Sequence, residues 1–138
     1  MALKAYSRAT EGAQPLSAHF CVREFACRDG SDPIFVEEEL VALLEAIRQH
    51  FGRAVVLTSG FRTAAHNTSL PHASPHSQHL YGRAADFQVE GISVEEAAAY
   101  AEALLPDSGG IGRYLPRAGR PNGWVHLDTR SRKARWMD

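Results

Sequence analysis

Two short stretches of the 138-residue sequence combine histidine and aspartate at spacings that suit metal chemistry. The first holds His79 and Asp86, and the second, forty residues further along, holds His126 and Asp128. Two imidazoles and one carboxylate form a ligand set that leaves the fourth position of a zinc ion open to water, as catalytic zinc sites do. His79, Asp86 and His126 are therefore candidate ligands for one zinc ion per chain.

The segments around these residues alternate between apolar and polar side chains, which is typical of half-buried strands. In AADFQV (84–89) the apolar residues share one face and Asp86 lies on the other. In WVHLD (124–128) His126 and Asp128 share the face opposite the two aliphatic residues. If the two strands are neighbours, the donors converge on one polar face. The residues alone leave an alternative open, in which Asp86 is an ordinary surface acid and the histidines are polar loop residues.

The rest of the chain predicts an α+β fold, a single compact domain with a small, mostly antiparallel sheet flanked by helices. Leucines and other apolar residues at three- and four-residue spacing, followed by glycine, indicate a helix over 36–51. We expect one domain over 1–138, with its core at about 17–130. The other expected elements are a turn-rich entry segment (17–30), strands at 54–59 and 109–114, a polar loop at 60–83, and a helix at 93–105 that begins with a capping box.

Composition excludes several classes of protein. A hydrophobic content of 44% with 22% charged residues is typical of a globular chain and not of a disordered one. No apolar run approaches the roughly 18 residues of a membrane span. The net charge of −1 argues against general nucleic-acid binding, although basic residues gather between 113 and 135. Cys21 and Cys27 are too few for a disulfide framework, and we expect them to be reduced, partly buried thiols.

The two motifs resemble those of a known family, the zinc D-Ala-D-Ala carboxypeptidases, whose wider group includes lysostaphin-type enzymes and the hedgehog signalling domain. The downstream His126 and Asp128 resemble the strand that carries the family's third ligand. The segments 59–63 (SGFRT) and 19–27 (HFCVREFAC) are similar to those of small, phage-type members, so the resemblance covers about 17–130. Five residues match the family pattern S-x-H-x-x-G-x-A-x-D: Ser77, His79, Gly82, Ala84 and Asp86.

The resemblance implies a hedgehog-like fold in which His79, Asp86 and His126 bind zinc. It also implies that Arg62 holds the terminal carboxylate of a substrate, a role that suits the two-pronged guanidinium. Ser77 is expected to bind the substrate backbone, with a hydrogen bond to its own loop as the alternative. For Arg62 the alternative is a structural role, in which it ties the polar loop to the sheet. The implied activity is hydrolysis of peptidoglycan stem peptides, of the D-Ala-D-Ala carboxypeptidase type. Neither nucleic acid nor a membrane is expected as a partner. The sequence predicts no particular oligomeric state.

The first residues of the chain lack the apolar core of a signal peptide. We therefore expect the protein to be cytoplasmic at synthesis. Together with the resemblance to phage-type members, this is compatible with release to the cell wall as a phage or prophage lysis enzyme.

One departure from the family pattern concerns the general base. Many relatives carry an acid three residues before the last zinc histidine, and this chain has Gly123 there. Asp128 is a candidate catalytic replacement, or it orients His126 through the imidazole N–H. The absence of this acid also allows an alternative function, a weakly active or inactive zinc-binding module that recognises peptidoglycan or a phage structural partner. Three histidines of the polar loop are further candidates for the base: His66, His72 and His76.

Overall fold

A computed structural model describes residues 2–138. Within this range no helix is both long enough and apolar enough to cross a membrane. In chain order the elements are β1 (Leu3–Ser7), α1 (Arg8–Glu11), the 3₁₀ turn η1 (Val22–Phe25), β2 (Pro33–Glu37), α2 (Glu38–Phe51), β3 (Val55–Ser59), α3 (Ala64–Ser69), the 3₁₀ turn η2 (Gln78–Tyr81), β4 (Ala84–Val89), α4 (Val94–Leu104), β5 (Gly110–Tyr114), β6 (Trp124–Asp128) and β7 (Ala134–Met137).

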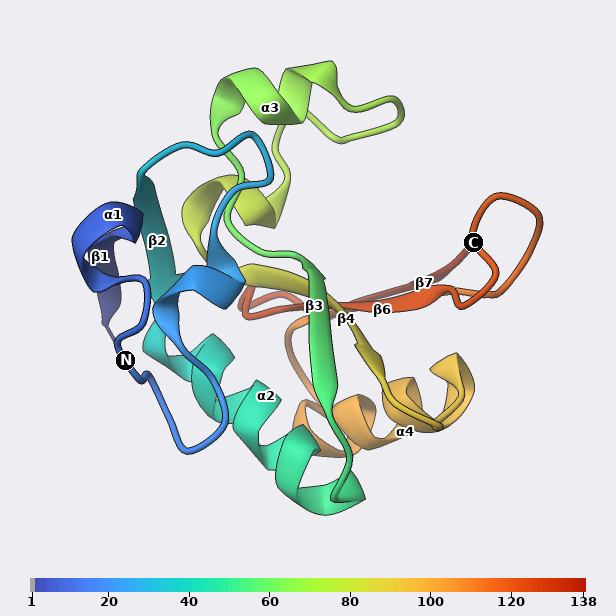
Figure 1. The fold of residues 1–138 in the computed structure, drawn as a ribbon. Helices are drawn as coiled ribbons and strands as arrows, with labels where there is room; N and C mark the ends of the chain where they lie inside the picture. The colour runs from blue at the N-terminus through green and yellow to red at the C-terminus, as the bar shows by residue number, and fades with distance from the viewer. Residues whose placement is uncertain (1) are drawn as a thin grey trace.

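A five-stranded sheet with the order β3-β4-β6-β5-β7 forms the centre of the molecule. All neighbouring strands are antiparallel except β5 and β7, which run parallel. Helices α2 and α4 lie beneath this sheet and α3 lies above it, while β1 and β2 form a separate ribbon at one side (Figure 1). The predicted α+β class, with a mostly antiparallel sheet flanked by helices, is confirmed.

The two faces of the sheet separate the core from the polar site. The lower face packs against α2 and α4 and carries buried apolar side chains, because alternate residues of a strand point to the same side. The opposite face carries Asp86 and His126, which are directly paired across β4 and β6. The core residues of this layer include Phe87, Ile111, Val125 and Leu127 from the strands and Leu44, Ile47, Ala98 and Ala101 from the helices.

Several elements differ from the sequence-based expectations. The predicted polar loop at 60–83 contains α3 and η2. Helix α2 begins at Glu38 rather than at residue 36, because Val36 and Glu37 extend β2 and pair with Lys4 and Leu3. The strands β1, β2 and β7 were not predicted, because none of them shows a clear alternation of apolar and polar residues.

The entry segment is fastened to α2 by a buried carboxylate, Glu45. Its oxygens accept hydrogen bonds from the Ser17 hydroxyl at 2.6 Å and from the His19 backbone N–H at 2.8 Å, and Oε2 lies 2.6 Å from His19 Nδ1. Burial by itself would raise the pKa of Glu45, but these hydrogen bonds outweigh it and lower the pKa to about 2. The ionised carboxylate therefore stabilises the folded chain.

We expect Glu45→Gln to lower the free energy of unfolding by about 1–3 kcal/mol at pH 7, the usual contribution of hydrogen bonds to a charged group. Because the folded-state pKa lies below the unfolded one, the contribution of Glu45 is complete above roughly pH 5 and is lost as the pH falls through about 2. Urea unfolding between pH 7 and pH 2.5 should show that the difference in the free energy of unfolding between parent and variant becomes smaller as the pH falls. Glu90→Gln, at an exposed position, is the control. A difference that stays constant with pH would contradict this role for Glu45.

Candidate metal centre and groove

Three candidate ligands converge above the centre of the sheet. His79 Nε2 lies 3.3 Å from Asp86 Oδ1, and His126 Nδ1 lies 2.9 Å from the same oxygen. Ligands of a tetrahedral zinc ion at bond lengths of about 2.0–2.1 Å are roughly 3.3 Å apart, so this spacing fits the ion. All three side chains are buried, and two imidazoles with one carboxylate are ordinary zinc ligands. The residues present therefore fit the metal that the sequence resemblance implies.

His79 is oriented by one hydrogen bond to its backbone and one to its imidazole ring. It lies in η2, where the Ser77 hydroxyl accepts the His79 backbone N–H at 3.3 Å. The imidazole Nδ1 donates to the carbonyl oxygen of Gly60 at 2.7 Å. Because a carbonyl can only accept, Nδ1 must carry the proton, and Nε2 is left free to bind a metal.

His126 is held between two carboxylates. Its Nδ1 faces Asp86, and its Nε2 lies 2.7 Å from Asp128 Oδ2. Burial would lower the pKa of His126, but the hydrogen bonds to Asp128 and Asp86 outweigh it and raise the pKa to about 9. Burial likewise acts to raise the pKa of Asp86, and the charges and hydrogen bonds of His79 and His126 nevertheless hold it well below its usual range. The two neighbouring carboxylates therefore favour the protonated form of His126, and a metal that binds Nδ1 would displace that proton.

Asp128 is fully buried behind the His126 ring, and both of its oxygens are occupied. Oδ1 accepts hydrogen bonds from the backbone N–H of Gly110 at 3.0 Å and from Arg130 Nε at 2.8 Å. Oδ2 is 2.7 Å from both His126 Nε2 and Arg130 Nη2. A Cβ at Gly110 would lie 2.2 Å from Oδ2, so only glycine leaves room for this carboxylate. The contacts fit an orienting role for Asp128 on the side of His126 opposite Asp86.

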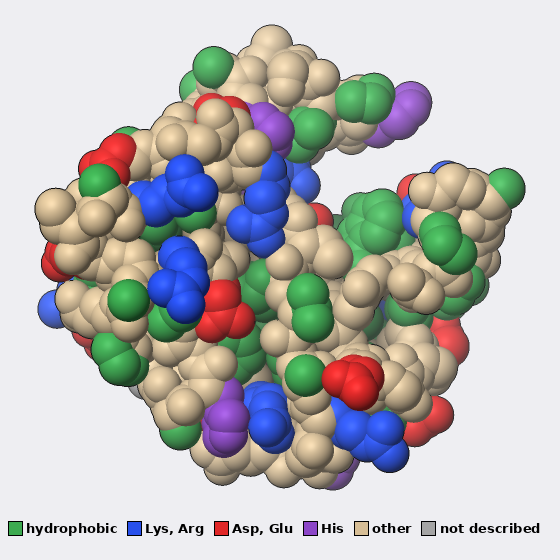
Figure 2. Space-filling model, viewed as in Figure 1, with side chains coloured by type: hydrophobic (Ala, Val, Ile, Leu, Met, Phe, Trp, Pro, Cys, Tyr) green, Lys and Arg blue, Asp and Glu red, His purple; other side chains and the backbone are tan. Residues whose placement is uncertain are grey.

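A groove of about 420 Å³ opens over the metal centre. Figure 2 shows it as the hollow between the upper lobe, which carries α3, and the lobe formed by the loop between β5 and β6. Arg62, His66, Asp86 and Trp124 are among the residues that line it. His79 and His126 lie behind Asp86 and expose only 2% and 7% of their surface.

Arg62 places its guanidinium at the floor of this groove. Nη2 lies 3.4 Å from Asp86 Oδ2, Nε donates to the Ser59 hydroxyl at 3.1 Å, and Nη1 donates to Asn67 Oδ1 at 3.3 Å. The structure thus brings Arg62 to the three predicted ligands. Ser77 instead uses its hydroxyl to cap η2, so its contact in this structure supports His79, and its predicted binding of substrate stays a prediction.

Gly123, at the position where many relatives carry an acid, has no room for any side chain. Its φ of +57° lies in the left-handed region that favours glycine, and a Cβ would lie 2.1 Å from the carbonyl oxygen of Tyr114. The Gln88 amide also donates to the Gly123 carbonyl at 2.7 Å. An acid at this position would require a different path for the loop between β5 and β6.

A comparison with protein families supports the same chemistry. The family model described as Peptidase M15 matches residues 17–128, which include every proposed ligand. The chain belongs to the peptidase M15 family. M15 peptidases are zinc-dependent, so this member is a zinc metallopeptidase, a hydrolase, with His79, Asp86 and His126 as its possible metal site. No curated protein matches the chain at a significant level.

Sequence reasoning missed three groups that complete this M15 site: the Gly60 carbonyl, the Arg130 side chain and the Gly110 backbone N–H. Arg130 had a detectable signal, because it stands two residues after Asp128 and side chains at that spacing share a face of an extended chain. The two backbone groups had none, since any residue offers a carbonyl or an N–H.

Proposed function

We propose that this M15 peptidase removes the terminal D-Ala from peptidoglycan stem peptides, as a D-Ala-D-Ala carboxypeptidase. The observation that carries the proposal is the Arg62 guanidinium 3.4 Å from Asp86 at the groove floor. One extended residue spans roughly 3.3–3.6 Å, so a C-terminal carboxylate on Arg62 places the last peptide bond beside the ligand set. The last bond of the substrate is therefore the one presented for cleavage.

The chain's own residues bind and orient the reactants. When bound, zinc supplies a Lewis acid that polarises a carbonyl and makes hydroxide available near neutral pH. Arg62 binds the terminal carboxylate through two parallel hydrogen bonds and so fixes the register of the peptide. Asp128 keeps the His126 ring in the orientation that directs Nδ1 at the metal position, and Gly60 does the same for Nε2 of His79.

The decisive experiment is incubation of the zinc-loaded chain with purified peptidoglycan and with a stem pentapeptide, followed by mass spectrometry. We expect free D-Ala and a tetrapeptide, with no product from Asp86→Ala. Internal cleavage without release of D-Ala would assign an endopeptidase instead.

A second candidate function is a zinc-binding module that recognises peptidoglycan without cleaving it. The observation in its favour is Gly123, where no acid can be accommodated. Zinc-dependent binding to peptidoglycan, with neither D-Ala nor internal fragments released, would support this function over catalysis.

We expect Arg62→Lys to slow hydrolysis of a carboxylate-terminated peptide by roughly 10–100-fold, because a point charge replaces a two-pronged hydrogen bond to a charged group. Bound zinc should not change. The same peptide with an amidated C-terminus is the control, since it lacks the group that Arg62 binds, and its slower hydrolysis should be insensitive to the substitution. An equal loss on both peptides would show that Arg62 acts on the fold or the ligands rather than on the substrate.

A further inference from the structure

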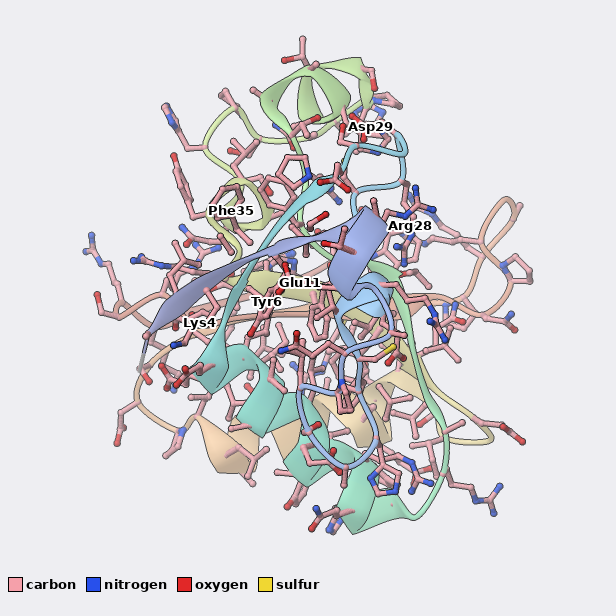
Figure 3. The ribbon with its side chains drawn as sticks, turned by 60° about the vertical axis from the view of Figure 1, so that its left-hand side comes forward. Lys4, Tyr6, Glu11, Arg28, Asp29 and Phe35 are labelled. Atoms are coloured by element: carbon pink, nitrogen blue, oxygen red, sulfur yellow. The ribbon has the colours of Figure 1, made fainter. Side chains whose placement is uncertain are left out.

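A second cluster of metal-binding side chains lies outside the centre described above. It consists of Cys27 and Asp29, on the loop between η1 and β2, and His66 on α3. One ligand atom from each of the three lies within 4.8 Å of the other two. Figure 3 shows Asp29 at the foot of α3, on the loop that leads to β2. The cluster thus joins two segments that are almost forty residues apart in the sequence.

Thr63, the residue that caps α3, contacts all three residues of the cluster. Its hydroxyl donates to Asp29 Oδ2 at 2.8 Å and accepts the His66 backbone N–H at 3.2 Å. Its own backbone N–H donates to Cys27 Sγ at 3.4 Å. Asp29 Oδ1 also accepts the Ser31 backbone N–H at 2.9 Å, so the carboxylate is held from both sides. These contacts hold the Cys27 sulfur and the Asp29 carboxylate and leave lone pairs on both for a metal, while His66 is held through its backbone.

The donor set selects the class of metal. One thiolate, one imidazole and one carboxylate suit zinc, whereas magnesium and calcium prefer oxygen ligands alone. Cys27 is buried, His66 is half-buried and Asp29 is exposed, so the cluster is accessible from solvent on the side of Asp29. Hydrogen bonds from Ser31 and Thr63 hold the pKa of Asp29 well below its usual range, so its carboxylate is charged at neutral pH.

Helix α3 has few other means of attachment. It is only six residues long, and Asn67 is its one buried residue among those described. Two side-chain hydrogen bonds attach it through Asn67, one from Arg62 and one to the carbonyl oxygen of Ser74. Because no apolar side chain of α3 is buried, a metal bridge to the loop before β2 would be the strongest tie available to it.

We propose that Cys27, Asp29 and His66 form a second zinc-class metal site, which fastens α3 to the loop between η1 and β2. Binding replaces the thiol proton of Cys27, which leaves to solvent as the sulfur–metal bond forms. His66 also lines the groove, so the ion would fix one wall of the substrate site without taking part in hydrolysis. The site requires no change in the first centre, which shares none of these residues.

Cobalt(II) distinguishes the two centres, because only the second contains sulfur. We expect the intact chain to bind two equivalents of cobalt(II) and to show a thiolate-to-cobalt charge-transfer band in the near ultraviolet. Cys27→Ser should bind one equivalent and lose the band. His126→Ala should also bind one equivalent but keep the band, and Cys21→Ser, which changes the other thiol, should keep both equivalents and the band.

His66→Ala is a second variant that does not alter the buried cysteine. It should reduce binding to one equivalent, with the far-ultraviolet circular dichroism spectrum close to that of the parent. A cobalt-loaded chain without the charge-transfer band would overturn the proposal. So would two equivalents bound by both Cys27→Ser and His66→Ala, since the cluster would then be a hydrogen-bonded group that holds no metal.

Discussion

His126→Ala is expected to remove one equivalent of zinc from each chain and to abolish peptide hydrolysis, and His79→Ala should do the same. Each substitution leaves Asp86 and one histidine as the only protein ligands of this centre, which are too few for a stable catalytic zinc site. The rise in melting temperature on addition of zinc should become smaller in these variants, because zinc can no longer stabilise the folded state through this centre.

His50→Ala is the matched control, since His50 is an exposed histidine in the last turn of α2 and does not line the groove. Its zinc content, activity and response of the melting temperature to zinc should equal those of the parent. Zinc content that stays at the parental value in both His79→Ala and His126→Ala would refute the ligand assignment, whatever happens to the activity.

Asp128→Asn should weaken zinc binding by about 10–100-fold, the usual effect of removing the carboxylate partner of a metal-bound histidine. Activity should recover in excess zinc, because Asp128 is fully buried behind His126 and its carboxylate hydrogen-bonds only to that ring, Arg130 and Gly110. The pKa of Asp128 is held well below its usual range, since hydrogen bonds from His126 and Arg130 outweigh the effect of burial. It is therefore a firmly ionised acceptor and a poor proton carrier at neutral pH.

The measurement is a zinc titration of hydrolysis and of metal binding, with Asp107→Asn as a control at an exposed acid. A shuttle role for Asp128 would appear differently, as a rate lower by roughly 10²–10⁴ at saturating zinc with unchanged affinity. Asp128→Asn also leaves the Arg130 guanidinium without its charged partner, so a lower melting temperature should accompany the weaker zinc binding.

The central layer of the fold could be predicted because its signals are periodic. Helix α2 follows the spacing of its leucines, and β4 and β6 follow their alternation, which also put Asp86 and His126 on the polar face. Helix α3 could not be found in this way, because it buries Asn67 and no apolar residue. Its only local signal was the helix-capping Thr63.

The other omissions depend on long-range pairing. Strand β7 pairs with β5, and its Trp136 occupies the space over Gly112, where a Cβ would lie 2.4 Å from the indole nitrogen. The four residues of β7 contain no sequence signal that would predict pairing with β5. The role of Asp128 depends on the same kind of information, because burial and the contacts with Gly110 become visible only once β5 and β6 are paired.

The two sides of the groove belong to elements that should differ in local stability. Asp86 and His126 belong to the inner strands β4 and β6, so their amide hydrogens should exchange with solvent only when the whole domain unfolds. Helix α3 has no apolar anchor, and its amides should exchange through local opening at much lower free energy. Local opening of α3 would therefore widen the groove while the metal ligands on β4 and β6 keep their positions, and a metal bound by Cys27, Asp29 and His66 would suppress that opening.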